Sequence, residues 1–152
     1  MPVSQRMEEK LLEALLSKAN YTATKQYIGL ATMKPSELTK SVTAKVFGEK
    51  EPKETDGWVR IEVDGPEWEM VKGEGETGPT IWVNKKPIVW KPPVTKGSYT
   101  LETFALVPKS KQSEDEAADA ISFFGRLTTA VSISATTTEL TIPAKQLELT
   151  AE

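Results

Sequence analysis

Apolar and polar residues alternate along the chain from residue 121 to residue 150. Val131 and Ile133 alternate with serines, and the same two-residue period continues around Leu140. A period of two places successive side chains on opposite faces of a β-strand. Pro143 cannot donate a backbone hydrogen bond, so it marks a strand boundary, a bulge or an edge. This part of the sequence predicts three or four short antiparallel strands packed on one core.

The preceding residues predict a series of further strands, at residues 25–32, 42–48, 58–63, 67–71, 80–84, 87–90 and 99–107. In the 58–63 segment, Val59, Ile61 and Val63 are expected on one face of the strand. Trp58, Arg60 and Glu62 are expected on the other face. Long polar loops are expected between the strands, at residues 33–41, 49–56, 72–79 and 109–119. Ser113 and Glu116 have the spacing of a capping box, which predicts a helical turn inside the last of these loops.

The N-terminal segment 4–19 has a helical period instead. Met7, Leu11 and Leu15 recur every fourth residue, with Leu12 and Leu16 widening the apolar stripe. Ser4 is the expected N-cap of this helix. Such a stripe does not remain in water, so it either packs on the strands or contacts another subunit. We favour packing on the strands and keep Met7, Leu11 and Leu15 as candidate interface residues.

Together these elements predict a single domain over residues 1–152, with a helix at 4–19 and strands over 25–150. The expected fold is mainly β, an antiparallel β-sandwich of jelly-roll or immunoglobulin-like type with one N-terminal α-helix. Charged residues make up 27% of the chain and its formal net charge is −3. This near balance does not favour nucleic acid or an anionic membrane as a partner. Without a long apolar run, the chain is expected to remain in aqueous surroundings.

The sequence contains neither cysteine nor histidine. It therefore lacks disulfides, thiolate nucleophiles, and the commonest general base and transition-metal ligand. The Gly-x-Gly-x-x-Gly pattern at residues 73–78 carries two glutamates and is followed by Pro79 where a phosphate-binding loop needs a helix. An acidic group in the 109–119 loop lacks the ligand spacing of a calcium loop, so a solvated loop is favoured. We predict no catalytic residue, no cofactor and no metal ligand.

The four tryptophans lie within one third of the chain, at Trp58, Trp68, Trp82 and Trp90. Tryptophan supplies a large contact area, so an exposed platform for sugar or protein is one interpretation. Packing between strands is favoured for most of them. Trp68, beside Pro66, is the expected exception. Trp68 and Trp82 join the candidate interface residues.

The order of these segments resembles a family of small virion structural proteins from tailed bacteriophages, of the tail-fibre-like or head-decoration (minor capsid) type. The resemblance rests on a helix ending in Leu-Leu and Tyr-Thr, on a Gly-Trp-Val-Arg-Ile strand and on a Phe-Phe-Gly-Arg-Leu-Thr strand near the end. These motifs occupy residues 15–22, 57–63 and 123–128, with further matching strands at 27–35, 88–90, 101–107 and 138–149. The loops around 71–80 and 109–119 are longer than in that pattern, so no contact residue is carried over.

The resemblance implies a non-enzymatic protein bound to the outside of a phage capsid as a decoration or minor capsid protein. Its partners would be the major capsid protein or the tail proteins of the same virion. It implies a homo-oligomer, with a trimer expected, that is assembled in the host bacterial cytoplasm and ends in the virion. A tail or tail-fibre component that contacts the host receptor is the first alternative. A carbohydrate-binding module is the second, and an enzyme that uses carboxylates is less favoured than either.

Overall fold

The structure is a computed structural model that describes residues 25–63, 68–72 and 80–150, together with Ser4, Met7, Glu9, Leu11 and Leu12. For residues 70–72, 80–82 and 148–150, it describes the backbone alone. Its strands are β1 (Gln26–Ala31), β2 (Ile61–Val63), β3 (Trp68–Lys72), β4 (Thr80–Asn84), β5 (Ile88–Trp90), β6 (Ser98–Val107), β7 (Phe123–Ser134), β8 (Leu140–Ile142) and β9 (Glu148–Thr150). Its helices are α2 (Ala44–Gly48) and the short 3-10 turns η1 (Pro35–Glu37), η2 (Glu54–Asp56) and η4 (Gln112–Glu114).

The central element is a four-stranded sheet of order β2-β1-β6-β7, in which all neighbours are antiparallel. β1 and β6 lie in its middle and are its most buried strands. β7 is longer than its partner, because residues 127–130 of β7 lie opposite the single residue Glu102 of β6. Such a bulge bends a strand and interrupts its hydrogen-bonding ladder.

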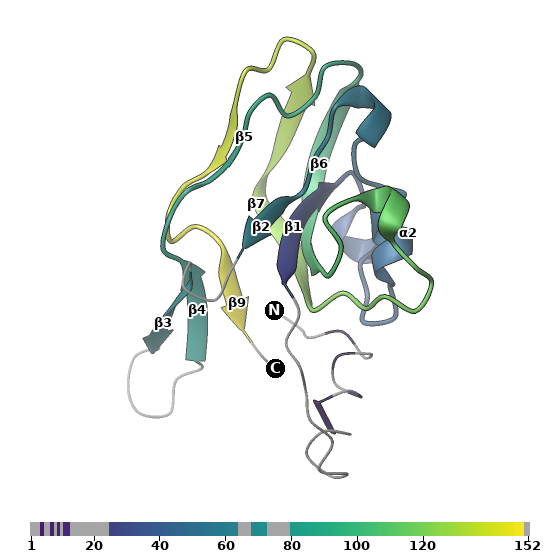
Figure 1. Cartoon of the computed structure of the whole chain (residues 1–152). Coiled ribbons are helices and arrows are strands. Elements are labelled where there is room, and N and C mark those ends of the chain that lie inside the picture. The colour runs from purple at the N-terminus through teal and green to yellow at the C-terminus, as the bar shows by residue number, and fades with distance from the viewer. Residues whose placement is uncertain are drawn as a thin grey trace.

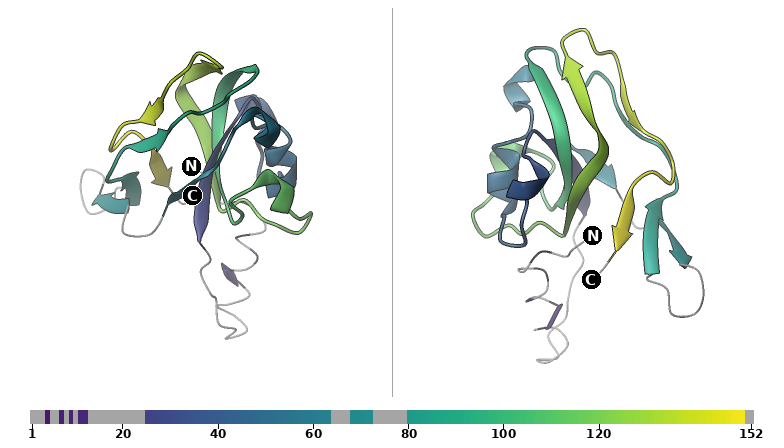
Figure 2. Two further views of the ribbon diagram at one scale, coloured as in Figure 1. Left: turned by 45° about the horizontal axis from the view of Figure 1, so that its top comes forward. Right: turned by 180° about the vertical axis from the view of Figure 1, so that it is seen from behind.

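Side chains of both faces of this sheet are buried, in two separate cores. Figure 2 shows β6 and β7 between α2 on one side and the antiparallel β5–β8 pair on the other. The larger core lies between the sheet and the β5–β8 pair, and includes Ile28, Phe104 and Trp90. The smaller core lies under α2 and includes Phe47 and Val107. Alternate residues of β6 therefore enter different cores, as the two-residue period requires.

A third, three-stranded sheet has the order β3-β4-β9 and lies below the β5–β8 pair in Figure 1. Asn84, at the end of β4, is 2% exposed and joins this sheet to the C-terminal segment. Its amide donates to the carbonyl oxygens of Lys86 and Pro143, at 2.9 and 3.0 Å. Its carbonyl oxygen accepts from the backbone N–H of Leu147 at 2.9 Å. One buried side chain thus fixes the relative positions of three backbone segments.

The structure confirms that the protein is mainly β with antiparallel sheets. The expected strands at 25–32, 67–71, 80–84, 87–90 and 99–107 appear as β1, β3, β4, β5 and β6, and the C-terminal run forms β7, β8 and β9. Pro143 directly follows the last residue of β8, at the predicted boundary. A helical turn is present in the 109–119 loop, but it is η4 and its N-cap is Lys111, so the predicted Ser113 capping box is wrong.

The strand predicted at residues 42–48 is wrong, because most of this segment forms the helix α2. The Thr43 side chain caps this helix by accepting the backbone N–H of Val46 at 3.3 Å. Phe47 is fully buried in the smaller core. A short apolar run does not distinguish a strand from a helix by its period alone, so the cap and the packing decide.

The prediction that the side chains of residues 58–63 alternate between the two faces of one strand is wrong for residues 58–60. The strand β2 begins only at Ile61, and residues 58–60 belong to neither a helix nor a strand. Val59, expected to face the core, is 55% exposed, whereas Arg60 is 6% exposed and Trp58 1%. The two-residue period holds only while a strand lies in a sheet, and residues 58–60 lie outside it.

Part of the predicted N-terminal helix lies within the described residues. Met7, Glu9, Leu11 and Leu12 have helical conformation. Ser4 caps the segment as predicted, because its side-chain oxygen accepts the backbone N–H of Met7 at 3.2 Å. Met7 is half-buried, but Leu11 and Leu12 are 46% and 55% exposed, so packing of the whole stripe on the strands is wrong for these two. Leu15 and Leu16 lie outside the described residues.

Candidate functional site

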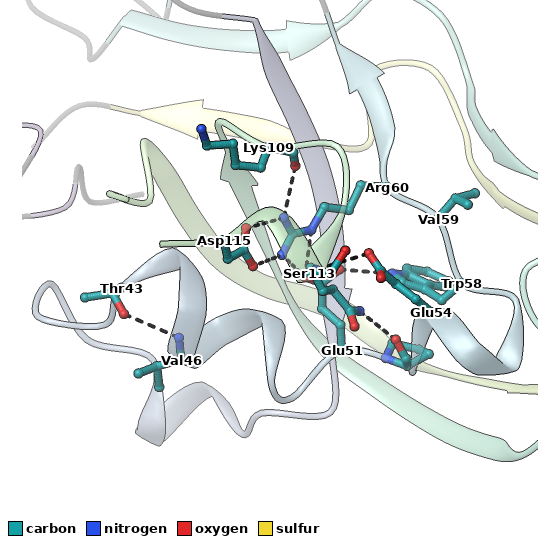
Figure 3. A network of polar contacts seen from close by, with 12 residues as sticks. Thr43, Val46, Glu51, Glu54, Trp58, Val59, Arg60, Lys109, Ser113 and Asp115 are labelled. Atoms are coloured by element: carbon teal, nitrogen blue, oxygen red, sulfur yellow. Dashed lines mark hydrogen bonds and ion pairs between the residues drawn. The ribbon is translucent and has the colours of Figure 1, made fainter. Parts of the chain in front are cut away.

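Three charged side chains from three separate segments of the chain meet beside the smaller core. Glu51 follows α2, Arg60 immediately precedes β2, and Asp115 follows η4. Their side chains are at most 1% exposed. Figure 3 shows the guanidinium of Arg60 lying between the two carboxylates. We call these residues the Glu51–Arg60–Asp115 cluster.

The guanidinium has five N–H groups, and all of them donate hydrogen bonds, four to the two carboxylates and one to a backbone oxygen. Nε and Nη2 donate to Oε1 of Glu51 at 2.9 and 2.6 Å. Nη1 and Nη2 donate to the two carboxylate oxygens of Asp115 at 2.7 and 2.6 Å. Nη1 also donates to the backbone oxygen of Lys109 at 3.0 Å. Arg60 therefore ties the 109–119 loop to the segment that follows α2.

The cluster continues into the larger core through two tryptophans. Nε1 of Trp58 donates to Oε2 of Glu51 at 2.9 Å. The Trp58 ring stacks on Trp90, with ring centroids 5.6 Å apart and an angle of 13° between the planes. Nε1 of Trp90 donates to the carbonyl oxygen of Val59 at 2.9 Å. Because both rings are almost fully buried, core packing, the favoured interpretation, is confirmed for Trp58 and Trp90.

Burial governs the protonation of the cluster, which holds two carboxylates and one guanidinium. Burial raises the pKa of Glu51 to about 7, although the charge and hydrogen bonds of Arg60 act in the opposite direction. For Arg60, burial acts to lower the pKa, but the hydrogen bonds to Asp115 and Glu51 outweigh it and raise the pKa. With both carboxylates ionised the cluster carries one net negative charge, so a proton on Glu51 makes it neutral.

The cluster can act as a clamp, because its hydrogen-bonding groups are engaged within the protein. Within the described part of the chain, no buried side-chain nitrogen or oxygen lacks a hydrogen-bond partner. A cleft of about 370 Å³ lies beside the cluster, lined by Trp58 and Arg60 on one side and by residues 110–113 on the other. The cleft reaches the buried edge of the clamp, whose own hydrogen-bonding groups already have partners.

Two glycines provide the space that the cluster occupies. A Cβ atom on Gly29 would lie 2.8 Å from Cδ of Glu51, and one on Gly48 would lie 2.5 Å from Oδ2 of Asp115. Both positions therefore exclude any larger residue unless the cluster moves. A glycine inside a strand pattern often marks such a close approach, and Gly29 lies in the middle of β1. This glycine is the one sequence signal that could have indicated the cluster.

Replacing Gly29 with alanine is expected to lower the free energy of unfolding by about 2 kcal/mol, since the new methyl group would displace a buried carboxylate. Chemical denaturation followed by tryptophan fluorescence measures this loss. The matched control makes the same substitution in a Glu51→Ala background, where the cost should fall below about 1 kcal/mol. An equal cost in both backgrounds would show that the strain comes from elsewhere.

Of the candidate interface residues, the structure describes the side chains of Met7, Leu11 and Trp68. Met7 and Leu11 belong to the N-terminal segment, and Leu15 lies outside the described residues. Trp68 is half-buried and packs against the larger core, while lining a second cleft. Trp82 lies within β4, where it pairs with Met70 and Leu149, and its side chain is outside the described part. Trp68 is thus less buried than Trp58 and Trp90, but it still contacts the larger core, and its expected role as a contact residue stays a prediction.

The acidic group of the 109–119 loop also differs from expectation. Asp115 is not solvated but buried against Arg60, so the solvated-loop interpretation is wrong at this position. Asp119 accepts the backbone N–H of Glu116 at 3.0 Å. Among the residues that the structure describes, no group of three acidic side chains could hold a metal ion.

Comparisons with known proteins assign no family to the chain. No protein-family model matches it, and no curated protein matches it significantly. Among the described helices, none is long and apolar enough to cross a membrane.

Proposed function

We propose that this protein is a non-enzymatic structural protein of a tailed bacteriophage, attached to the outside of the capsid as a decoration or minor capsid protein. The observation that carries the structural role is the Glu51–Arg60–Asp115 cluster. Its charged groups are buried, mutually paired and saturated with hydrogen bonds. Catalytic groups need access to a substrate, whereas a buried clamp holds distant segments in one arrangement. The virion assignment is supported by the order of segments, which resembles that of phage virion proteins.

The proposal includes a β-sandwich as the finer description of the fold. The four-stranded sheet and the β5–β8 pair enclose one apolar core between them, which supports this description. The jelly-roll and immunoglobulin-like types both remain compatible with it. A rigid two-layer core suits a protein that is repeated many times on a particle surface.

Attachment is proposed to involve the N-terminal segment. Leu11 and Leu12 are large apolar side chains in helical conformation, and about half of each is exposed. An apolar patch formed by neighbouring exposed side chains is typical of surfaces that contact another protein. The partners proposed are the major capsid protein, or tail proteins, and further copies of this chain in a trimer. Many copies of one modest interface would give an avid attachment.

Immunogold electron microscopy on purified virions tests the location. Label over the head is the expected result. Label along the tail or at its tip would favour the alternative of a tail or tail-fibre component. Absence of the chain from purified particles would refute both virion proposals.

A carbohydrate-binding module is the second candidate function, because Trp68 is half-buried and lines a cleft. Titration with a panel of glycans, followed by tryptophan fluorescence, tests it. A saturable change that disappears in a Trp68→Ala variant would support this candidate. An unchanged spectrum across the panel would remove it.

A further inference from the structure

The Glu51–Arg60–Asp115 cluster contains two carboxylates but only one cation. Its side chains are at most 1% exposed, so water does not compensate their charges. The charge of Arg60 balances only one carboxylate at a time. When Glu51 carries a proton, Arg60 balances Asp115 and the cluster is neutral. When Glu51 is ionised, one negative charge remains unbalanced inside the protein, and burial of an unbalanced charge is costly.

The two carboxylates differ in how the protein holds them. Glu51 lies between α2 and η2, and its Oε2 also accepts from Nε1 of Trp58 at 2.9 Å. Trp58 is 1% exposed and belongs to the larger core. Asp115 belongs to the 109–119 loop instead, and neither core includes a residue of this loop. Asp115 is therefore the carboxylate that can leave Arg60 without disturbing a core.

Apart from its bonds to Arg60, the middle of this loop makes two hydrogen bonds to the segment that includes η2. The Gln112 side chain donates to the backbone oxygen of Pro52 at 2.6 Å. The backbone N–H of Ser113 donates to the carboxylate of Glu54, in η2, at 3.4 Å. The same part of the loop forms one wall of the cleft of about 370 Å³ beside the cluster. Movement of the loop would therefore widen this cleft.

Among the described residues, the neighbours of the two carboxylates bring no second cation to the cluster. β1 meets Glu51 with Gly29, and α2 meets Asp115 with Gly48. On the loop, Lys109 contributes its backbone oxygen to the guanidinium, and Figure 3 shows its ammonium group turned away from the carboxylates. The excess negative charge is therefore not balanced within the described part of the chain.

We propose that the cluster is a pH-sensitive latch on the 109–119 loop, closed while Glu51 is protonated and released when Glu51 is ionised. In the closed state Arg60 balances Asp115 and holds the loop. When Glu51 loses its proton to solvent, Arg60 pairs with Glu51, and Asp115 moves into water with its loop. A neutral buried pair remains. This inference does not depend on the virion assignment, because it concerns one loop of the isolated chain.

The size of the response follows from linkage between loop opening and the proton on Glu51. In the closed state, burial raises the pKa of Glu51 to about 7, and the charge of Asp115 adds to this rise while Arg60 opposes it. Opening removes the charge of Asp115 and admits water, so the pKa of Glu51 is lower in the open state. The proton therefore stabilises the closed state below pH 7, and this effect is lost as the pH rises through 7. The open population should rise about tenfold from about pH 6 to about pH 8.

The test is amide hydrogen exchange of the isotope-labelled full chain by NMR at about pH 6 and about pH 8, with and without a low concentration of urea. Each rate is divided by the intrinsic rate of the unfolded sequence at the same pH, which gives the protection of each amide. We expect the protection of residues 110–116 to fall about tenfold between the two pH values. It should not respond to urea, because a local opening exposes little surface. Exchange in β6 should be slower and should respond to urea, because it requires global unfolding.

Two variants identify the titrating group. Glu51→Gln cannot ionise, so residues 110–116 should have the same protection at both pH values. Glu114→Gln is the matched control, because Glu114 is an exposed carboxylate of the same loop. This control should retain the change of about tenfold.

Several outcomes would overturn the proposal. Constant or rising protection of residues 110–116 between the two pH values in the native chain would refute the latch without any substitution. Equal urea dependence in this loop and in β6 would show that the loop opens only by global unfolding. A pH response that persists in Glu51→Gln would assign the titration to another group. Because exchange is measured on the isolated protein and labelled virions report only location, failure of this test and failure of the virion proposal are distinguishable.

Discussion

Replacing Arg60 with methionine is expected to lower the free energy of unfolding by about 3 to 5 kcal/mol. The substitution leaves the carboxylates of Glu51 and Asp115 buried, close together and without their common partner. It also removes the bond that holds the backbone oxygen of Lys109. Urea denaturation, followed by the fluorescence of the stacked tryptophans, measures the loss.

A triple variant, Glu51→Leu, Arg60→Met and Asp115→Leu, serves as the matched control. It replaces the whole cluster with apolar side chains and leaves no unpaired charge, so it should be more stable than the single Arg60→Met variant. Comparing the stabilities of the two variants separates the cost of a buried charge without a partner from the contribution of the ion pairs. If the triple variant is less stable than the single variant, the main cost of the Arg60→Met substitution is not the burial of unpaired carboxylates.

The stability of the protein is expected to decrease as the pH rises from about 4.5 to about 8. The pKa of Glu51 is raised from 4.5 to about 7 in the folded protein, chiefly by burial. Between these values the folded state holds a proton that the unfolded state has lost, so its stabilising effect is complete below pH 4.5 and is lost as the pH rises through 7. The expected contribution of this group over the whole interval is about 3 kcal/mol.

The measurement is the free energy of unfolding at half-unit pH steps, compared between the native chain and Glu51→Gln. The glutamine cannot titrate, so its stability should vary less across this interval. It also cannot accept hydrogen bonds from both Trp58 and Arg60 at once, so at pH 5 the variant should be less stable than the native chain by about 1 kcal/mol. Parallel pH profiles for the two proteins would show that Glu51 does not titrate in this range.

The Arg60→Met substitution is also expected to loosen the 109–119 loop locally, in addition to lowering the stability of the whole protein. Asp115 bonds Arg60, and the Gln112 side chain donates to the backbone oxygen of Pro52 at 2.6 Å. Loss of the Arg60 contact leaves the loop held by Gln112 and by the bond from the Ser113 backbone to Glu54. Amide hydrogen exchange in residues 110–116 should therefore accelerate in the Arg60→Met variant more than exchange in β6.

The sequence by itself determined most strands and the class of the fold. β1, β6 and the C-terminal strands follow from β-branched and alternating residues, because a strand with one or both faces buried needs that composition. Capping also follows locally, as Ser4 shows. The absence of cysteine and histidine excluded disulfides and histidine ligands for the whole chain.

Only the tertiary structure decided that the Glu51–Arg60–Asp115 cluster forms and that most of the 42–48 segment is a helix. Arg60 alternates like a solvent-facing residue, yet it is buried because the carboxylates of Glu51, nine residues away, and of Asp115, 55 residues away, surround it. The 42–48 segment is compatible with strand and helix, and the Thr43 cap and the burial of Phe47 select the helix. The partners of a buried charge are long-range contacts, and a local pattern carries no information about which distant segments meet.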